Sequence, residues 1–269
     1  MKIIPFGCSH MATTSHAVGL KNSELCSEVF SSEMNGIIGG NSNEKIIEDV
    51  YRVANNYGLE PKFHGFDVSK TYTSGIEFGK IDLTDTVFYI QSTYTNRLWL
   101  PTTLDSYTSS FHSFQSDGSL IYINNKFAKS ELKNFYEIYI KYFWNYYLNL
   151  LDLLQKIDML QTYLKSKNIP FVHMFWTFGG NTNEWEGINL IDDSNRNLSN
   201  IKKQIDDILN KIDFIKPYGY NNVTDWTDDL MKTKTREDIF DDGIHLNQDN
   251  AYNLFTEVIY PACKSKITS

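Results

Sequence analysis

Residues 2–10 read KIIPFGCSH, and this stretch sets the expected fold. Its apolar run predicts a short buried strand over residues 3–6. The small and polar residues that follow, Gly7, Cys8, Ser9 and His10, predict a tight turn at the end of that strand. Ligands of open α/β sheets bind outside the carboxyl ends of the strands. Ser9 is therefore expected at this ligand-binding edge, although a serine in this place taken alone also fits an ordinary helix N-cap or turn.

The other end of the chain carries a second polar signal, DGIH at residues 242–245, directly before an amphipathic helix expected over 248–260. A serine, an aspartate and a histidine are the members of a hydrolytic triad. Ser9 would be the nucleophile, His245 would accept its proton, and Asp242 would orient and stabilise the imidazolium. The order Ser…Asp…His, with the last two three residues apart, is unusual and therefore diagnostic.

Between these ends, apolar runs of strand length alternate with helical patterns. Such alternation predicts an α/β fold, with a mostly parallel sheet covered on both faces. Strands are predicted over 36–40, 86–91 and 169–176, and helices over 23–34, 44–57, 198–212 and 224–231. Pro261 is expected to end the last helix, 248–260.

Residues 97–130 interrupt this alternation with aromatic side chains set among Ser, Thr, Asp and Asn. Loops of this length are usually lids or binding surfaces, so an insertion over the carboxyl edge of the sheet is expected, with a hairpin at 119–124. A long helix is predicted over 131–166, apolar around most of its circumference. Its aromatic side chains are expected in the core or in a subunit interface, which is compatible with a homo-oligomer.

The composition excludes several classes of function. The net charge is −8 and the lysines are scattered, which argues against a nucleic-acid partner. No segment has the length and apolarity of a membrane span. The apolar run at the N-terminus is far shorter than that of a signal peptide, so a soluble cytoplasmic protein is expected, one that would leave a cell by another route, such as lysis or a particle. The length fits a single domain, residues 1–269.

The sequence also lacks the common cofactor motifs. No histidine pair has zinc-site spacing, no Cys-His cluster exists and no glycine-rich phosphate loop is present, so neither a metal nor a nucleotide cofactor is expected. The three cysteines form no CxxC pair and are expected as reduced thiols. His173 lies within a predicted strand and is expected in the core. A GxSxG motif is absent, which argues against the α/β-hydrolase fold.

Three further segments offer groups for an oxyanion or a substrate. Gly40 precedes the helix predicted over 44–57, where a glycine and free backbone N–H groups suit an oxyanion. The same segment also fits a simple helix cap, in which Asn41 and Glu44 form a capping box. Polar residues follow the predicted strand 86–91, and the candidates there are Thr93, Asn96 and Arg97, the last equally readable as a surface arginine. His10, beside Ser9, is expected to line the pocket.

Taken together, these blocks resemble the SGNH (GDSL-like) hydrolases. Gly7-Cys8-Ser9 matches the first block, Gly40 matches the oxyanion glycine of the second, and Asp242 with His245 matches the last. The Gly-Cys-Ser opening is most similar to variants encoded by phages and bacteria. The resemblance implies a three-layer α/β/α sandwich with flavodoxin-like topology, catalysis without a cofactor and, for a phage protein, association with the virion.

This sequence departs from the family pattern in its third block, which normally reads Gly-x-Asn-Asp. Here Gln91-Ser92-Thr93-Tyr94 occupies that place, with Thr93 about where the oxyanion asparagine should be. Losing one oxyanion donor lowers the rate by about 10²–10³-fold. Cys8 replaces the usual aspartate and Leu246 stands where a proline often follows the histidine. Neither change removes the triad.

The function expected from the triad and the resemblance is that of a serine esterase forming an acyl-serine. The family and the aromatic insertion favour a carbohydrate O-deacetylase, acting on a small acyl ester or an acetylated glycan. One alternative is an acyltransferase, in which an acceptor hydroxyl instead of water reaches the acyl-serine. The other is a non-catalytic phage structural or host-binding protein built on the same scaffold, which the altered third block favours.

Overall fold

The computed structural model describes residues 1–30, 36–37, 43–55, 83–93, 97–99, 111–113, 146–178, 196–242 and 245–268. Its strands are β1 (Lys2–Gly7), β2 (Gly36–Ile37), β3 (Thr86–Ser92), β4 (Arg97–Trp99), β5 (Phe111–Ser113) and β6 (Phe171–Phe175). Its α-helices are α1 (Ser9–Lys21), α2 (Ser23–Val29), α3 (Asn43–Ala54), α5 (Tyr146–Ser166), α7 (Arg196–Leu209), α8 (Val223–Leu230), α9 (Gln248–Asn253) and α10 (Tyr260–Thr268). A 3₁₀ turn, η1 (Pro217–Gly219), and a π turn, η2 (Leu254–Ile259), complete the set.

Four of the described strands form one parallel sheet in the order β2-β1-β3-β6. Ile3 of β1 pairs with Val87 of β3, and Phe88 of β3 pairs with Phe171 of β6. The chain therefore runs from β1 outward to β2 and then returns to the opposite side of β1 for β3. Such a reversal opens a crevice at the carboxyl ends of the two strands that flank it, here β1 and β3. The α/β class predicted from the sequence is confirmed.

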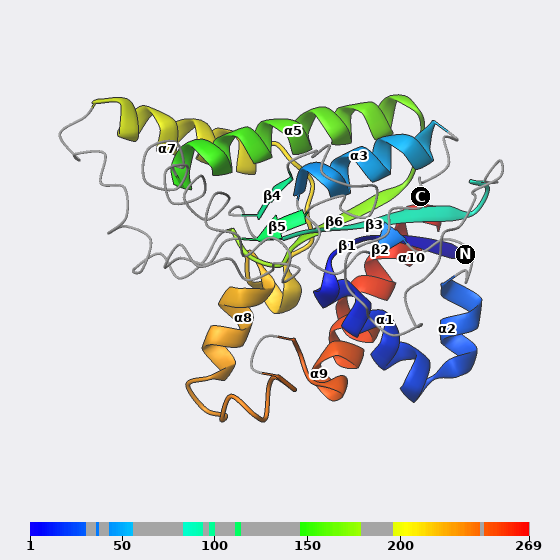
Figure 1. The fold of residues 1–269 in the computed structure, drawn as a ribbon. Helices are drawn as coiled ribbons and strands as arrows, with labels where there is room; N and C mark the ends of the chain where they lie inside the picture. The colour runs from blue at the N-terminus through cyan, green and yellow to red at the C-terminus, as the bar shows by residue number, and fades with distance from the viewer. Residues whose placement is uncertain are drawn as a thin grey trace, which may run out of the picture.

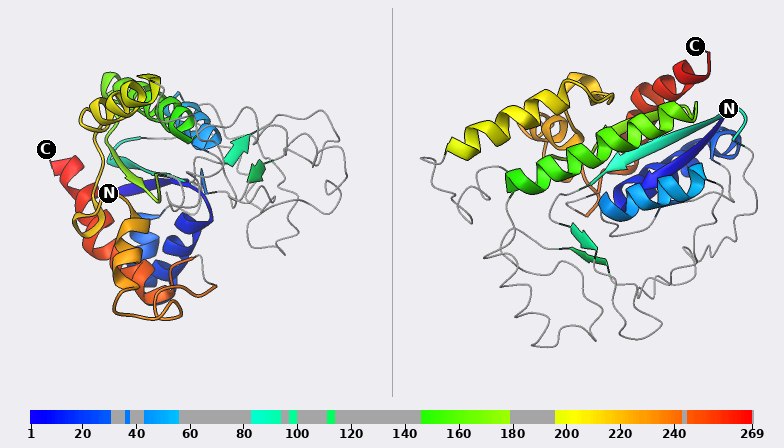
Figure 2. Two further views of the ribbon diagram at one scale, coloured as in Figure 1. Left: turned by 90° about the vertical axis from the view of Figure 1, so that its left-hand side faces the viewer. Right: turned by 90° about the horizontal axis from the view of Figure 1, so that it is seen from above.

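The central strands are apolar on both faces because helices lie on both sides of the sheet (Figures 1 and 2). Successive side chains of a strand point to opposite faces. Ile3 accordingly belongs to a core cluster with residues of α1, α9 and α10, whereas Ile4 belongs to one with residues of α3 and α5. Both side chains are buried. This burial explains why β1 and β3 read as continuous apolar runs.

The predicted insertion contains β4 and β5, which pair antiparallel apart from the main sheet. Arg97 lies opposite Ser113 in this pair. The hairpin predicted at 119–124 and the part of the long helix predicted before residue 146 lie outside the described residues. The described part of that helix, α5, ends at Ser166 as predicted.

Two predictions near the N-terminus, one of a helix and one of a turn, were wrong. The helix predicted over 23–34 ends at Val29, because Phe30 takes an extended backbone and forms a parallel bridge with Ile3. Ser9 was predicted on a turn after the first strand, but it is the first residue of helix α1. The chain thus passes from β1 into α1 through the single residue Cys8.

The prediction that Pro261 ends the last helix was also wrong. The chain continues from α9 through the π turn η2 into α10, which contains Pro261 and runs to Thr268. Proline lacks an N–H and its ring collides with the carbonyl four residues earlier in a regular α-helix. The π turn directly before Pro261 widens the helix at that point, so the helix can continue.

The three cysteines, Cys8, Cys26 and Cys263, are all described and are free thiols in the structure. Burial raises the pKa of the Cys263 thiol to about 12. Among the described helices, none combines the length and the apolar character that crossing a membrane requires.

Candidate active site

The predicted nucleophile lies where β1 meets α1. Cys8 has an extended backbone and is the N-cap of α1, and its carbonyl accepts from the N–H groups of Met11 and Ala12. Ser9 follows as the first helical residue. The first N–H groups of a helix have no acceptor within it, and the helix dipole favours negative charge there. The backbone of Ser9 therefore suits an oxyanion; its side chain lies outside what the structure describes.

Asp242 and His245 form a hydrogen-bonded pair at the other end of the chain. Oδ2 of Asp242 lies 2.6 Å from Nδ1 of His245, and the backbone N–H of His245 donates to Oδ1 of Asp242 at 2.7 Å. A carboxylate can only accept, so Nδ1 of the imidazole carries the hydrogen. In the neutral ring Nε2 is then free of a proton and able to accept one. This is the tautomer a general base needs.

The pair remains open to solvent, which a substrate requires. The side chain of Asp242 is 55% exposed and that of His245 is 26% exposed. The imidazole is therefore accessible to a small molecule, while its hydrogen bond to the Asp242 carboxylate fixes its orientation.

His10 brings the two ends of the chain together. Its ring stacks on Trp176, with centroids 3.8 Å apart and planes 11° from parallel, and it lies 4.8 Å from the ring of His245. Since His10 directly follows Ser9, the backbone of Ser9 lies in the neighbourhood of the Asp242–His245 pair. His10 is almost fully buried, and its ring contacts both Trp176 and the ring of His245.

Thr93, the predicted third-block residue, is fixed by three hydrogen bonds. Its N–H donates to Oδ1 of Asn43 at 2.8 Å, and its carbonyl accepts from Nδ2 of Asn43 at 3.1 Å. Its hydroxyl accepts from the Cys8 thiol, with Sγ and Oγ1 3.4 Å apart. These contacts join the ends of β1 and β3 to the start of α3. Thr93 has no exposed surface, so its observed contacts are structural.

The remaining predicted site residues are described in part or not at all. Gly40 and Asn96 lie outside the described residues, as does Asn41 of the expected capping box. Arg97 is placed only through its backbone, as the first residue of β4. Of the predicted residues, the structure thus brings His10 and His245 into contact, pairs Asp242 with His245, and ties Thr93 to Cys8, the residue before Ser9.

Sequence reasoning missed two residues that build this region, Asn43 and Trp176. Asn43 lies in the stretch Asn-Ser-Asn-Glu, residues 41–44, in which only Asn41 and Glu44 were considered, as a capping box. Trp176 directly follows β6, and the carboxyl ends of parallel strands meet at one edge of a sheet. Its place after a predicted strand could therefore have indicated that it lies near the site. Its carbonyl accepts from both the N–H and the hydroxyl of Thr224, which attaches this strand end to α8.

Within the described part of the chain, no three His, Cys, Asp or Glu side chains are grouped so as to hold a metal ion. Comparison of the chain with protein-family models, curated proteins and solved structures found no match in any of the three.

Proposed function

We propose that this protein is a serine esterase of the SGNH type, with Ser9, His245 and Asp242 as its triad. The observation that carries the proposal is the contact between His10, which follows Ser9, and His245, whose Nδ1 is hydrogen-bonded to Asp242. This contact supports the proposal because it brings the backbone at one end of the chain, where Ser9 precedes His10, near Asp242 and His245 at the other end.

In the proposed reaction, Nε2 of His245 accepts the proton of the Ser9 hydroxyl as Oγ bonds to the ester carbonyl carbon. Asp242 stabilises the imidazolium. The N–H groups of Ser9 and Gly40 donate to the oxyanion. The bond to the leaving alcohol then breaks as His245 returns its proton to that oxygen. Water, deprotonated by His245, attacks the acyl-serine, and Ser9 recovers its proton as the acid leaves.

The same proposal assigns the chain to a single domain with the three-layer α/β/α arrangement and flavodoxin-like topology of that family. The reversal of strand order between β1 and β3 supports it, because Cys8 and Thr93 follow these two strands. Residues 97–130 would cover the site as a lid. Their aromatic side chains suit the faces of sugar rings, which makes an acetylated glycan the proposed substrate.

One observation favours a second candidate, a non-catalytic binding protein on the same scaffold. Thr93 stands where the family has an oxyanion asparagine, yet its side chain is buried and engaged by Cys8. An oxyanion site that relied on Thr93 would then lack a donor. We favour the esterase because backbone N–H groups can supply the remaining donors.

The test is reaction of the purified protein with a fluorophosphonate, read by intact mass. The native chain should gain one adduct, and Ser9→Ala and His245→Ala should gain none. Asp242→Asn should lower kcat for p-nitrophenyl acetate by up to about 10⁴-fold, because an amide favours the wrong imidazole tautomer. Asp241→Asn is the matched control: its exposed side chain neighbours Asp242, and only its backbone N–H bonds to His245.

A folded native chain that gains no adduct would overturn the esterase and leave the binding protein. An adduct that survives in Ser9→Ala would assign the nucleophile to another residue.

A further inference from the structure

The segment that carries Asp242 and His245 folds back on itself before α9 begins. Phe240 and Leu246 form an antiparallel bridge, and the N–H of Asp241 donates to the carbonyl of His245 at 3.0 Å. The N–H of Asn247 closes the segment by donating to the carbonyl of Ile239 at 2.9 Å. The Asp242–His245 pair therefore lies at the end of a short loop whose base is residues 238–240 and 246–247.

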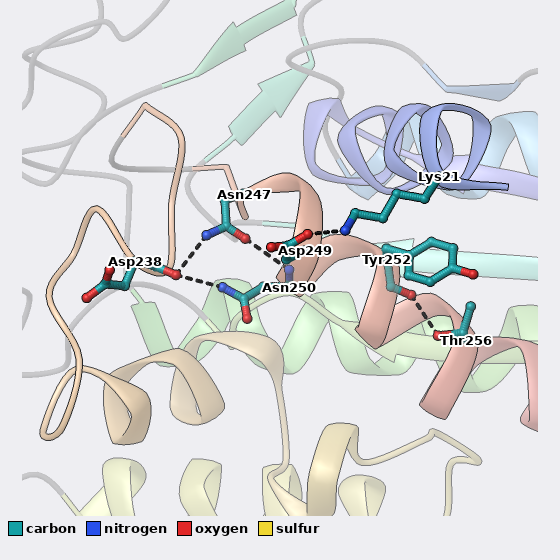
Figure 3. A network of polar contacts seen from close by, with 7 residues as sticks. All are labelled: Lys21, Asp238, Asn247, Asp249, Asn250, Tyr252 and Thr256. Atoms are coloured by element: carbon teal, nitrogen blue, oxygen red, sulfur yellow. Dashed lines mark hydrogen bonds and ion pairs between the residues drawn. The ribbon is translucent and has the colours of Figure 1, made fainter.

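Two asparagine side chains from the start of α9 hold the base of this loop (Figure 3). Nδ2 of Asn247 donates to the carbonyl of Asp238 at 2.7 Å, and Nδ2 of Asn250 donates to the same carbonyl at 3.1 Å. Asn250 also reaches the carbonyl of Ile239 at 3.3 Å. The carbonyls of Asp238 and Ile239 are thus bonded to side chains at the start of α9.

The two ends of the Asn247 carboxamide have separate tasks. Its Oδ1 accepts from the N–H of Asn250 at 2.9 Å and so caps α9, whereas its Nδ2 binds the loop at Asp238. The side chain of Asp238 is also held in place, since its carboxylate accepts hydrogen bonds from the N–H and the hydroxyl of Thr235. These bonds lower the pKa of the Asp238 carboxyl.

Helix α9 is in turn attached to α1, the helix that begins at Ser9. Lys21 in the last turn of α1 forms an ion pair with Asp249 in the first turn of α9, and its Nζ lies 5.8 Å from the ring centre of Tyr252 (Figure 3). A continuous path of helices and hydrogen bonds thus runs from Ser9 along α1 to α9 and, through Asn247, to the loop of Asp242 and His245.

We infer that Asn247 is a positioning residue for the proposed triad, a role that rests on the proposed function. Its Nδ2–H holds the Asp242–His245 loop against α9, and α9 packs against α1, which begins at Ser9. The position of His245 relative to Ser9 is thereby maintained. A displacement of a reacting group by about 1 Å can lower a rate by about 10²-fold. The amide donor of Asn247 therefore contributes to turnover, and its amide oxygen contributes to helix stability.

Asn247→Asp separates these two tasks. Aspartate caps a helix as well as asparagine does, but it cannot donate and it faces the Asp238 carbonyl with a negative charge. We expect Asn247→Asp to lower kcat for p-nitrophenyl acetate by about 10- to 100-fold with little change in KM. Its unfolding midpoint should stay near that of the native chain, whereas Asn247→Ala should lose both activity and stability.

Asn22→Asp is the matched control. Asn22 is the N-cap of α2, where its Oδ1 accepts from the N–H of Leu25 at 3.0 Å. The same substitution there should leave kcat unchanged. A native kcat in Asn247→Asp, or equal losses of stability in Asn247→Asp and Asn247→Ala, would overturn the inference and leave Asn247 a cap alone.

A second measurement does not depend on hydrolysis. The hydrogen between Nδ1 of His245 and Asp242 should give a downfield proton NMR signal in the native chain and in Asn22→Asp, and this signal should vanish or shift in Asn247→Asp. A native chain that gives no fluorophosphonate adduct would end the esterase proposal, yet this comparison would still decide whether Asn247 holds the pair. An unchanged signal in Asn247→Asp, or none in the native chain, would overturn the inference.

Discussion

At the scale of single residues, Gly7 sets how closely α1 can start against β1. A Cβ added at Gly7 would lie 3.0 Å from Cβ and 3.0 Å from Cε of Met11, a residue of the first turn of α1. The Cε atom can move with its flexible side chain, but the Cβ of Met11 moves only with the helix backbone. Gly7 is therefore required by packing between the strand β1 and the helix α1.

Gly7→Ala should destabilise the protein by about 1–3 kcal/mol, the usual effect of overpacking a filled core. The shift of α1 should also displace Ser9 and slow fluorophosphonate labelling. Gly19→Ala in the same helix is the control. Its Cβ would meet only Sγ of Cys26 at 3.5 Å, an ordinary contact, so the better helix propensity of alanine should stabilise it slightly. Urea unfolding checks both; equal stabilities would refute the packing argument.

At the scale of secondary structure, Asn43 fastens α3 to the end of β3. Its carboxamide pairs with both the N–H and the carbonyl of Thr93, and both residues are buried. Asn43→Ala leaves two buried backbone groups without these partners, at about 1–3 kcal/mol each. We expect a loss of about 3 kcal/mol in the free energy of unfolding, measured in urea.

Asn55→Ala is the matched control for Asn43→Ala. Asn55, just beyond the end of α3, also makes two side-chain hydrogen bonds, to the carbonyl of Tyr51 and from the hydroxyl of Tyr163, but it is exposed. Water can replace those partners, so the change should stay within about 0.5 kcal/mol. Similar losses in the two variants would count against the role of Asn43.

The elements that were predicted correctly from the sequence are those whose buried positions are occupied by apolar residues. β1 and β3 contain continuous apolar runs, β6 is apolar except for His173, and α3 shows one apolar stripe. Helix α1 was missed because its buried positions, 10, 11, 14, 17 and 18, have helical spacing but include His10 and Thr14, which hide the pattern. Thr14 is accommodated inside because its hydroxyl donates to the carbonyl of His10.

The candidate site divides in the same way. The pairing of Asp242 with His245 is local, since only two residues lie between them, and the sequence predicts it. The contacts of Asn43 with Thr93 and of His10 with Trp176 join segments far apart in the chain. They depend on the strand order and on the path of α1, which no local pattern specifies.

At the scale of the whole molecule, a buried network around His173 links stability to pH. Gln161 is oriented by the backbone of Asp213, whose N–H donates to Oε1 and whose carbonyl accepts from Nε2, both at 2.8 Å. Nε2 of Gln161 therefore faces Nδ1 of His173, 3.3 Å away, as a donor. Nδ1 must then accept, so Nε2 of His173 carries the hydrogen and donates to Oγ of Ser92 at 2.8 Å.

This arrangement fits only the neutral imidazole. Burial lowers the pKa of His173 from 6.5 to about 3. A proton added at Nδ1 would in addition point at the N–H of Gln161. Between these two pKa values the unfolded chain binds a proton at His173 and the folded chain does not. The contribution of the neutral His173 to the free energy of unfolding is therefore fully present above about pH 6.5. As the pH falls toward 3 this contribution is lost, by up to about 1.4 kcal/mol per pH unit.

His173→Gln removes this titration together with the ring. The variant should be less stable than the native chain at pH 7.5, but its disadvantage should shrink steadily as the pH falls from 6.5 to 4. His16→Gln, on the exposed side of α1, is the control, and its stability at pH 7.5 should stay within about 0.5 kcal/mol of that of the native chain. Urea unfolding at each pH measures the three curves. A constant gap between native chain and His173→Gln would mean that His173 takes up its proton in the folded state as readily as in the unfolded one.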